Sequence, residues 1–91
     1  MKLQWTSKAF ADLARLYEVL ASVNQPAAAR TIQMLTKAPM ILLTNPRAGK
    51  QLFQFEPREV RRILAGRYEI RYEIQDETIY VLRLWHTREE R

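Results

Sequence analysis

The chain of 91 residues contains no cysteine and a single histidine. Without cysteine it forms no disulfide and offers no thiolate to a metal ion, and such a composition is typical of proteins from a reducing compartment. The histidine and the scattered carboxylates form no cluster at the close spacing that metal ligands need. We therefore expect no disulfide, no metal site and no cofactor.

Long apolar runs are also missing. Met1 to Trp5 includes polar side chains and begins no signal peptide, and no window is long enough to span a membrane. The segment Ala48 to Gln51 has a superficial likeness to a phosphate loop, but it lacks the upstream glycine and the Ser or Thr after the lysine. These absences favour a cytoplasmic protein and exclude this route to nucleotide hydrolysis.

Positive charge is what the chain has in excess. It carries 15 lysines and arginines against 10 acidic residues, a net charge of +5. Nine of the arginines fall from Arg47 onward, and the planar guanidinium group suits contact with phosphate or carboxylate through two hydrogen bonds. The partner is therefore expected to be acidic, either a nucleic acid or an acidic protein segment.

The first half of the chain predicts a short strand and two helices. Leu3 to Trp5 alternates apolar and polar residues, and the next pair, Thr6 and Ser7, suits a helix N-terminus near Ser7. Pro26 suits the first turn of a second helix, and so short a connection predicts an antiparallel helical hairpin. The expected apolar positions are Phe10, Leu13, Ala14, Tyr17, Leu20 and Ala21 in the first helix, and Ala27, Ala28, Ile32, Leu35 and Ala38 in the second.

The middle of the chain is expected to be irregular. Pro39 interrupts a helix, so residues 40 to 43 form a final turn, a restarted helix or a buried loop. Residues 45 to 57 contain two prolines and a glycine and predict a connection with a short extended piece at 52 to 55. The chain is thus organised as one domain, 1–91, with a strand and hairpin (2–44), a loop (45–58), and a sheet with a basic tail (59–91).

The last third predicts an antiparallel meander. From Arg67 to Ile74, charged and apolar residues alternate without exception, which is the period of a strand with one buried face. Val60 to Ala65 and Thr78 to Trp85 supply two further strands, and Asp76-Glu77 is the turn between the last two. Tyr68, Tyr72 and both tryptophans are then core residues, whereas Glu69 and Glu73 are interpreted as solvated.

An uninterrupted hairpin fixes the expected register of the last two strands. The pairs are Ile74 with Ile79, Tyr72 with Val81, Ile70 with Arg83, Tyr68 with Trp85, Arg71 with Leu82, and Arg67 with His86. Basic side chains are expected to gather on the face opposite Tyr72.

The order of these elements resembles the RelE/ParE superfamily of bacterial toxins from type II toxin-antitoxin systems. The resemblance spans nearly the whole chain and is carried by Val60 to Ile63, Tyr68 to Ile74, the acidic turn, Ile79 to Leu84, and His86-Thr87-Arg88. It implies an α+β fold with a short N-terminal strand, an α-helical hairpin and a three-stranded antiparallel meander (βααβββ).

The resemblance also implies a toxin that arrests growth when a cognate antitoxin releases it. RelE-like members cut messenger RNA on the ribosome, whereas ParE-like members are associated with poisoning DNA gyrase and are not nucleases. In a nuclease, Arg62, His86 and Arg88 would form the site, but Leu64 stands where another cation is expected and no tyrosine follows Tyr80. We therefore favour the ParE-like branch, with a messenger RNA endonuclease and a non-toxic nucleic-acid-binding or interaction module as alternatives.

Two surfaces are candidates for binding partners. The expected target-binding residues are Arg62, Arg67, Arg71, Arg83, Arg88 and Arg91. An acidic, largely disordered antitoxin segment that folds on binding would suit the positive charge. It is expected either on the helical hairpin at Leu16, Leu20 and Val23 or along a sheet edge, giving a hetero-oligomer of toxin and antitoxin.

Overall fold

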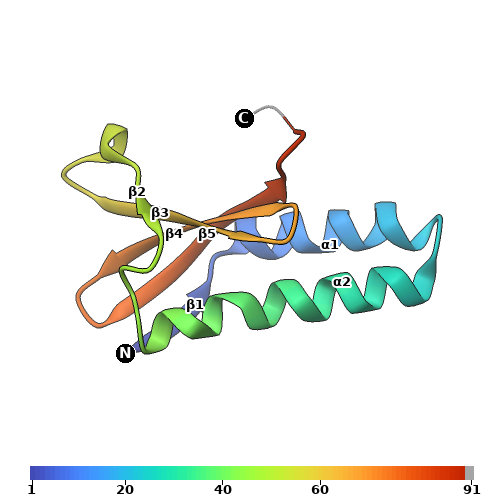
Figure 1. Ribbon diagram of the computed structural model, residues 1–91, viewed down its shortest axis with the longest axis horizontal. Helices are drawn as coiled ribbons and strands as arrows, with labels where there is room; N and C mark the ends of the chain where they lie inside the picture. The colour runs from blue at the N-terminus through green and yellow to red at the C-terminus, as the bar shows by residue number, and fades with distance from the viewer. Residues whose placement is uncertain (90–91) are drawn as a thin grey trace.

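A computed structural model of the chain describes residues 1 to 89. Its elements are β1 (Lys2–Trp5), α1 (Ser7–Ala21), α2 (Gln25–Lys37), the 3₁₀ helix η1 (Ala38–Leu43), β2 (Lys50–Gln51), the 3₁₀ helix η2 (Phe53–Phe55), β3 (Glu59–Ala65), β4 (Tyr68–Gln75) and β5 (Thr78–His86). The strands form a five-stranded sheet in the order β1-β5-β4-β3-β2, with β1 parallel to β5 and the other neighbours antiparallel (Figure 1). The predicted α+β order is confirmed, and β1 and β2 extend the meander on its two sides.

Side chains at the predicted caps fix where the two helices begin. The Thr6 hydroxyl accepts a hydrogen bond from the Ala9 N–H at 3.2 Å, and the Asn24 side chain accepts one from the Ala27 N–H at 3.1 Å. Each bond satisfies a backbone donor that has no partner within its helix. Both predicted helix starts are confirmed.

The chain between the helices and the meander differs in part from expectation. After α2 it continues as η1 with Pro39 buried, which corresponds to the restarted helix among the three alternatives. The extended piece expected at 52 to 55 is wrong in position, because the strand residues are Lys50 and Gln51 and the chain turns as η2 immediately afterwards.

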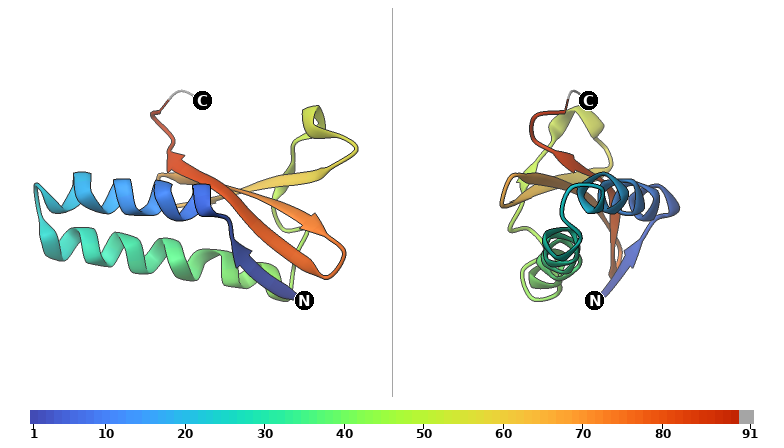
Figure 2. Two further views of the ribbon diagram at one scale, coloured as in Figure 1. Left: turned by 180° about the vertical axis from the view of Figure 1, so that it is seen from behind. Right: turned by 90° about the vertical axis from the view of Figure 1, so that its right-hand side faces the viewer.

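The helical hairpin projects beyond the sheet. α1 and α2 lie side by side, and their connecting turn is at the end of the molecule opposite the β2 side of the sheet (Figures 1 and 2). This arrangement gives the molecule extents of 40 × 26 × 22 Å. The tip of the hairpin therefore has no sheet beneath it.

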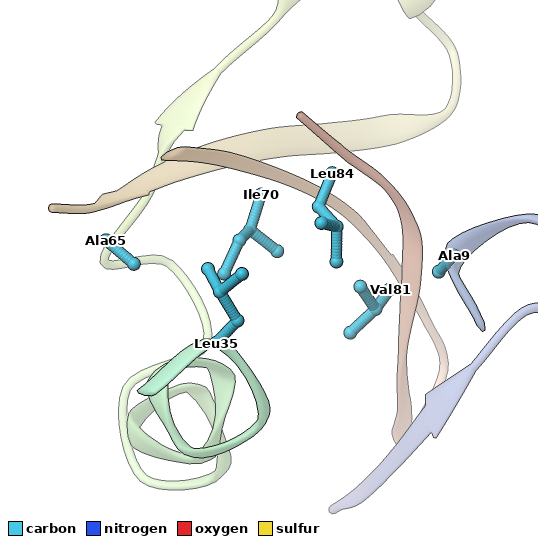
Figure 3. Packing of buried hydrophobic residues seen from close by; sticks show 6 residues of the cluster. All are labelled: Ala9, Leu35, Ala65, Ile70, Val81 and Leu84. Atoms are coloured by element: carbon cyan, nitrogen blue, oxygen red, sulfur yellow. The ribbon is translucent and has the colours of Figure 1, made fainter. Parts of the chain in front are cut away.

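The hydrophobic core lies between the helices and one face of the sheet. Leu35 from α2 lies below Ile70 and Ala65, whereas Ala9 from α1 lies beside Val81 (Figure 3). The expected buried stripe of α1 is wrong at Phe10, which is 57% exposed and stacks on Trp5 with the ring centroids 5.8 Å apart. Ala9, one residue earlier, is buried instead, whereas the predicted Leu13 does pack against the core.

The predicted register of β4 and β5 holds for only half of the hairpin. Ile74 pairs with Ile79 and Tyr72 with Val81 as expected, but a β-bulge at Leu82 then shifts the pairing by one residue. The observed partners are Arg71 with Arg83, Ile70 with Leu84, Glu69 with Trp85, and Tyr68 with His86. The predicted partners of Arg71, Ile70, Tyr68 and Arg67 are therefore wrong.

The bulge decides on which side of the sheet two large residues lie. Since side chains alternate between the faces, one extra residue moves Arg83 and Trp85 to the side opposite Tyr72. The Thr6 hydroxyl donates to the backbone oxygens of Val81 and Leu82 at 2.9 and 3.1 Å, which ties the start of α1 to the bulge. We call the side that holds Arg62, Glu69, Arg71, Glu73, Arg83 and Trp85 the outer face, and the side that holds Tyr68, Ile70, Tyr72, Ile74, Ile79, Val81 and Leu84 the inner face.

Candidate functional site

Three of the predicted target-binding arginines form a row across the outer face. Arg62 of β3 pairs with Arg71 of β4, and Arg71 pairs with Arg83 of β5. Directly paired residues on one face lie about 5 Å apart, so three guanidinium groups emerge close together. The predicted gathering of basic side chains opposite Tyr72 is confirmed for Arg71, whereas Arg83 was expected on the Tyr72 side and joins the row because of the bulge.

Arg71 occupies the centre of this row. Its guanidinium carbon lies 5.2 Å from the ring centroid of Phe55 and 4.8 Å from that of Trp85, distances at which a cation is attracted to an aromatic face. One Nη atom lies 3.4 Å from a Glu69 carboxylate oxygen, while the buried Nε has no hydrogen-bond partner among residues 1 to 89. The two rings hold the guanidinium in place.

Arg83 is held by Asp12, a carboxylate of α1. Asp12 is 2% exposed and accepts hydrogen bonds from Nε and Nη2 of Arg83 at 2.7 and 3.1 Å and from the Leu84 N–H at 3.1 Å. Burial alone raises the pKa of Asp12, but these bonds and the charges of Arg83 and Arg15 outweigh burial and lower it. The burial of Asp12 could have been predicted from spacing: Asp12 follows the buried Ala9 by three residues, so the two side chains lie on the same side of the helix.

Arg58 and Glu73 form a second ion pair at this face. Nε and Nη2 of Arg58 donate to the two carboxylate oxygens of Glu73 at 3.1 and 2.7 Å. Hydrogen bonding from Arg58 lowers the pKa of Glu73 and outweighs the opposing effect of burial. The interpretation of Glu73 as a solvated residue is therefore wrong: its exposed fraction is 4%, and its carboxylate is hydrogen-bonded to Arg58 and Gln75.

The three residues proposed for a nuclease site are not brought together. Arg62 lies on the outer face, 3.6 Å from Glu69, whereas His86 pairs with Tyr68 on the inner side and contacts its ring edge-on. Arg88 is exposed, and its backbone N–H donates to His86 Nδ1 at 3.1 Å. The sheet separates Arg62 from the histidine.

The remaining predicted arginines lie at or beyond the ends of strands. Arg67 is exposed in the turn between β3 and β4, where its carbonyl oxygen accepts a hydrogen bond from the Thr87 N–H at 2.9 Å. This bond places the start of the tail beside the turn. Arg91 lies outside the described residues.

The predicted antitoxin-binding residues lie along α1 toward the tip of the hairpin. Leu16 packs against the core and Leu20 is half-buried, while Val23, just after the helix, is 88% exposed. Val19 is not among the predicted residues and is 60% exposed one turn before Val23. Together these residues give the hairpin an apolar surface that is partly exposed to solvent in the described structure.

The described part of the chain has neither a membrane-spanning helix nor a metal-binding cluster. None of its helices is long and apolar enough to cross a membrane. Residues 1 to 89 also hold no group of three His, Cys, Asp or Glu side chains placed to bind a metal ion.

Comparison with known proteins identifies the family. A family model described as the ParE toxin of a type II toxin-antitoxin system, parDE, matches residues 3–91. The chain belongs to the ParE toxin family. Its fold is similar to a solved structure described as a chromosomal ParDE TA system from P. aeruginosa, with a TM-score of 0.80, 24% identity, and 94% of this chain and 95% of that chain covered.

No curated protein sequence matches the chain. The expectation of a RelE/ParE-superfamily toxin is nevertheless confirmed by the family model, and so is the preference for the ParE branch. As a ParE toxin of a type II system, the chain is expected to have a cognate antitoxin of the ParD kind.

Proposed function

We propose that this ParE toxin arrests growth in the cytoplasm by inhibiting DNA gyrase and that a cognate acidic antitoxin neutralises it. The observation that carries the choice of target over messenger RNA cleavage is the placement of Arg62 and His86 on opposite faces of the sheet. Family membership supplies the rest of the argument, since ParE-like toxins are associated with gyrase.

The distance between these two residues disfavours a shared reaction centre. Their partners on β4, Arg71 and Tyr68, are three residues apart, which is about 10 Å along a strand. A general base acts within about 3 Å of the proton it removes, and loss of a transition-state contact typically costs about a hundredfold or more in rate. A toxin that binds its target without cutting RNA fits this arrangement better.

The proposed target-binding surface consists of the arginine row on the outer face, together with the arginines of the β3–β4 turn and of the C-terminal tail. Arg62, Arg71 and Arg83 supply the row, Arg67 and Arg88 are exposed in the turn and the tail, and Arg91 is included from its place in the sequence alone. Exposed guanidinium groups suit hydrogen bonding to acidic side chains or phosphates. These six residues are proposed to bind the complex of gyrase and DNA.

The proposed antitoxin-binding surface is the hairpin, at Leu16, Val19, Leu20 and Val23. Charge favours an acidic segment as its occupant, because the chain carries +5. An amphipathic helix places its apolar residues on such a surface and leaves its acidic side free to interact with basic residues of the toxin. The exposed Val19 and Val23 then become buried in the hetero-oligomer.

The target is tested with purified toxin in two parallel assays, inhibition of DNA supercoiling by gyrase and cleavage of a transcript in a translating extract. We expect supercoiling to be inhibited and the transcript to remain intact. Transcript cleavage with unaffected supercoiling would mean that the target is ribosome-bound messenger RNA and not gyrase. Growth arrest with neither response would place the target outside both, and a harmless expressed protein would contradict the toxin function itself.

The antitoxin surface is tested by a charge placed at the tip of the hairpin. Val23→Asp is expected to stay toxic but to escape neutralisation, because an acidic residue there repels an acidic partner and removes apolar contact. Phe53→Asp is the matched control, since Phe53 is 66% exposed in η2, a segment that lies away from the hairpin tip at the other end of the molecule (Figure 1). Equal neutralisation of both variants would move the antitoxin to another surface.

A further inference from the structure

We infer that a cleft between the start of α1 and the outer face of the sheet is a binding site for a phosphate group of a nucleic-acid backbone. The cleft has a volume of about 500 Å³. Its lining residues are Thr6, Ser7 and Lys8 of α1 and its cap, Phe55 and Arg58, and Arg71, Leu82 and Arg83 of the sheet. This inference goes beyond the choice of target, because phosphate binding here does not depend on gyrase.

The arginines of the cleft are held rigidly and still have unused donors. Arg58 and Arg83 each use Nε and Nη2 on an internal carboxylate, and Arg71 uses Nη2 on Glu69. The Nη1 atom of each has no hydrogen-bond partner among residues 1 to 89. Three positioned Nη1 groups are therefore available to a bound anion without the entropy loss of ordering long side chains.

The first turn of α1 brings further donors to the same cleft. Ala9 and Phe10 N–H groups are satisfied by Thr6, whereas those of Ser7 and Lys8 have no partner in the described part of the chain. No acidic residue is present in this first turn, and Lys8 adds a cation where the helix dipole is already positive. An anion bound in the cleft relieves this repulsion.

The geometry of the donors favours phosphate over carboxylate. A planar carboxylate is recognised by a guanidinium fork, and the forks of Arg58 and Arg83 are already occupied by Glu73 and Asp12. What remains are single donors that come from the helix end on one side and the strands on the other. Donors from several directions suit the tetrahedral oxygens of a phosphate.

Binding is measured first with inorganic phosphate, by following backbone amide shifts of the full chain in nuclear magnetic resonance spectra. We expect saturable shifts at the Ser7 and Lys8 amides, with acetate at equal ionic strength producing much smaller ones. Equal shifts with acetate, or shifts spread over all basic residues, would overturn the inference.

A proline at the first helical position removes one donor without breaking the helix. Ser7→Pro is compatible with this position, since Thr6 has the extended backbone that precedes proline (φ −72°, ψ 162°). It is expected to weaken phosphate binding about tenfold, while Ser7→Ala, which keeps the N–H, retains most of it. If Ser7→Pro folds and binds phosphate as the wild type does, the helix end is not part of the site.

The source of the phosphate is decided with a fluorescently labelled single-stranded oligothymidylate and an acidic peptide of equal charge. We expect the oligonucleotide to bind more tightly than the peptide. Lys8→Glu should weaken oligonucleotide binding about tenfold and lower the slope of log K against log salt by about one. Arg30→Glu makes the same charge change on exposed α2 surface and is expected to have a smaller effect. Tighter binding of the peptide, or equal effects of the two variants, would contradict a backbone phosphate site.

Discussion

The two faces of the sheet use opposite chemistry at neighbouring positions of the same strand. On the inner face, Ile70 and Tyr72 are completely buried among aliphatic side chains. On the outer face, Arg71 lies between them in sequence and is held by two aromatic rings, and Glu73 follows Tyr72 and is held by an ion pair with Arg58. One strand therefore supports both a hydrophobic core and a charged surface, one residue apart.

The comparison indicates how stability and binding are divided in this toxin. Burial of aliphatic surface stabilises the fold by about 25 cal/mol per Å². Buried ion pairs stabilise little compared with apolar replacements, because desolvation opposes their attraction. The inner face therefore supplies most of the stability, and the outer face holds charged groups in position.

The largest effect is expected on the inner face. Ile70→Ala removes a completely buried side chain and leaves a cavity, so the free energy of unfolding should fall by about 4 kcal/mol. Urea denaturation followed by circular dichroism measures it. Leu64→Ala, at a 60% exposed outer position, should change stability by less than about 0.5 kcal/mol, and similar losses in both variants would erase the distinction between the faces.

Asp12→Asn tests whether the ion pair between Asp12 and Arg83 is required for stability. The substitution weakens the hydrogen bonds to Arg83 and leaves its charge unpaired, and we expect a loss of about 3 kcal/mol at pH 7. Glu18→Gln, at an exposed position of the same helix, is the control. An unchanged urea midpoint for Asp12→Asn would mean that solvent, not Asp12, stabilises Arg83.

The same variant has a pH signature. Because the folded pKa of Asp12 is lowered, its contribution is present above the unfolded pKa of about 4 and is lost as pH falls through the folded value. Wild-type stability should therefore fall steeply below about pH 4, and Asp12→Asn should show a shallower decline. Parallel curves for the two proteins in acid would contradict the lowered pKa.

Tyr72→Phe tests a polar contact that the inner face makes at its edge. The hydroxyl donates to the Pro46 carbonyl oxygen at 2.7 Å and accepts from the Gly49 N–H at 3.0 Å, so it anchors the loop before β2. Its loss leaves two backbone groups unpaired and should cost about 1.5 kcal/mol. Tyr80→Phe is the control in thermal denaturation, and equal melting temperatures would show that water replaces the hydroxyl.

Arg62→Ala should separate binding from stability most clearly. Its contact with Glu69 is a partly exposed pair at 3.6 Å, so stability should change by about 0.5 kcal/mol or less. Growth arrest on expression should nevertheless weaken, because one member of the arginine row is lost. Arg30→Ala provides the control outside the row, and full toxicity of Arg62→Ala would remove Arg62 from the target-binding surface.

The smallest stability change is expected in the tail. Arg88 is exposed, and only its backbone N–H makes a hydrogen bond within the described residues. Arg88→Ala should therefore leave the urea midpoint unchanged while toxicity falls. A variant that is both stable and fully toxic would count against a role for the tail.

Local pattern was sufficient to predict most elements but not their exact contacts. Thr6 and Asn24 marked the helix starts, and the alternation from Arg67 to Ile74 marked the central strand, because both signals depend on neighbouring residues alone. The buried stripe of α1 was predicted one residue off at Phe10, since only the docked sheet determines which side of a helix is covered. The candidate site depended still more on distant residues.

The sequence by itself determined that β4 has one apolar and one charged face, because a strand's period of two is an intrinsic property of the extended backbone. The tertiary structure decided which residues join those faces. Thr6 binds the carbonyl oxygens at the Leu82 bulge, and this one extra residue moves Arg83 beside Arg71 and within reach of Asp12. Residues so far apart in the chain meet only when the helix docks, and the arginine-rich outer face exists for that reason.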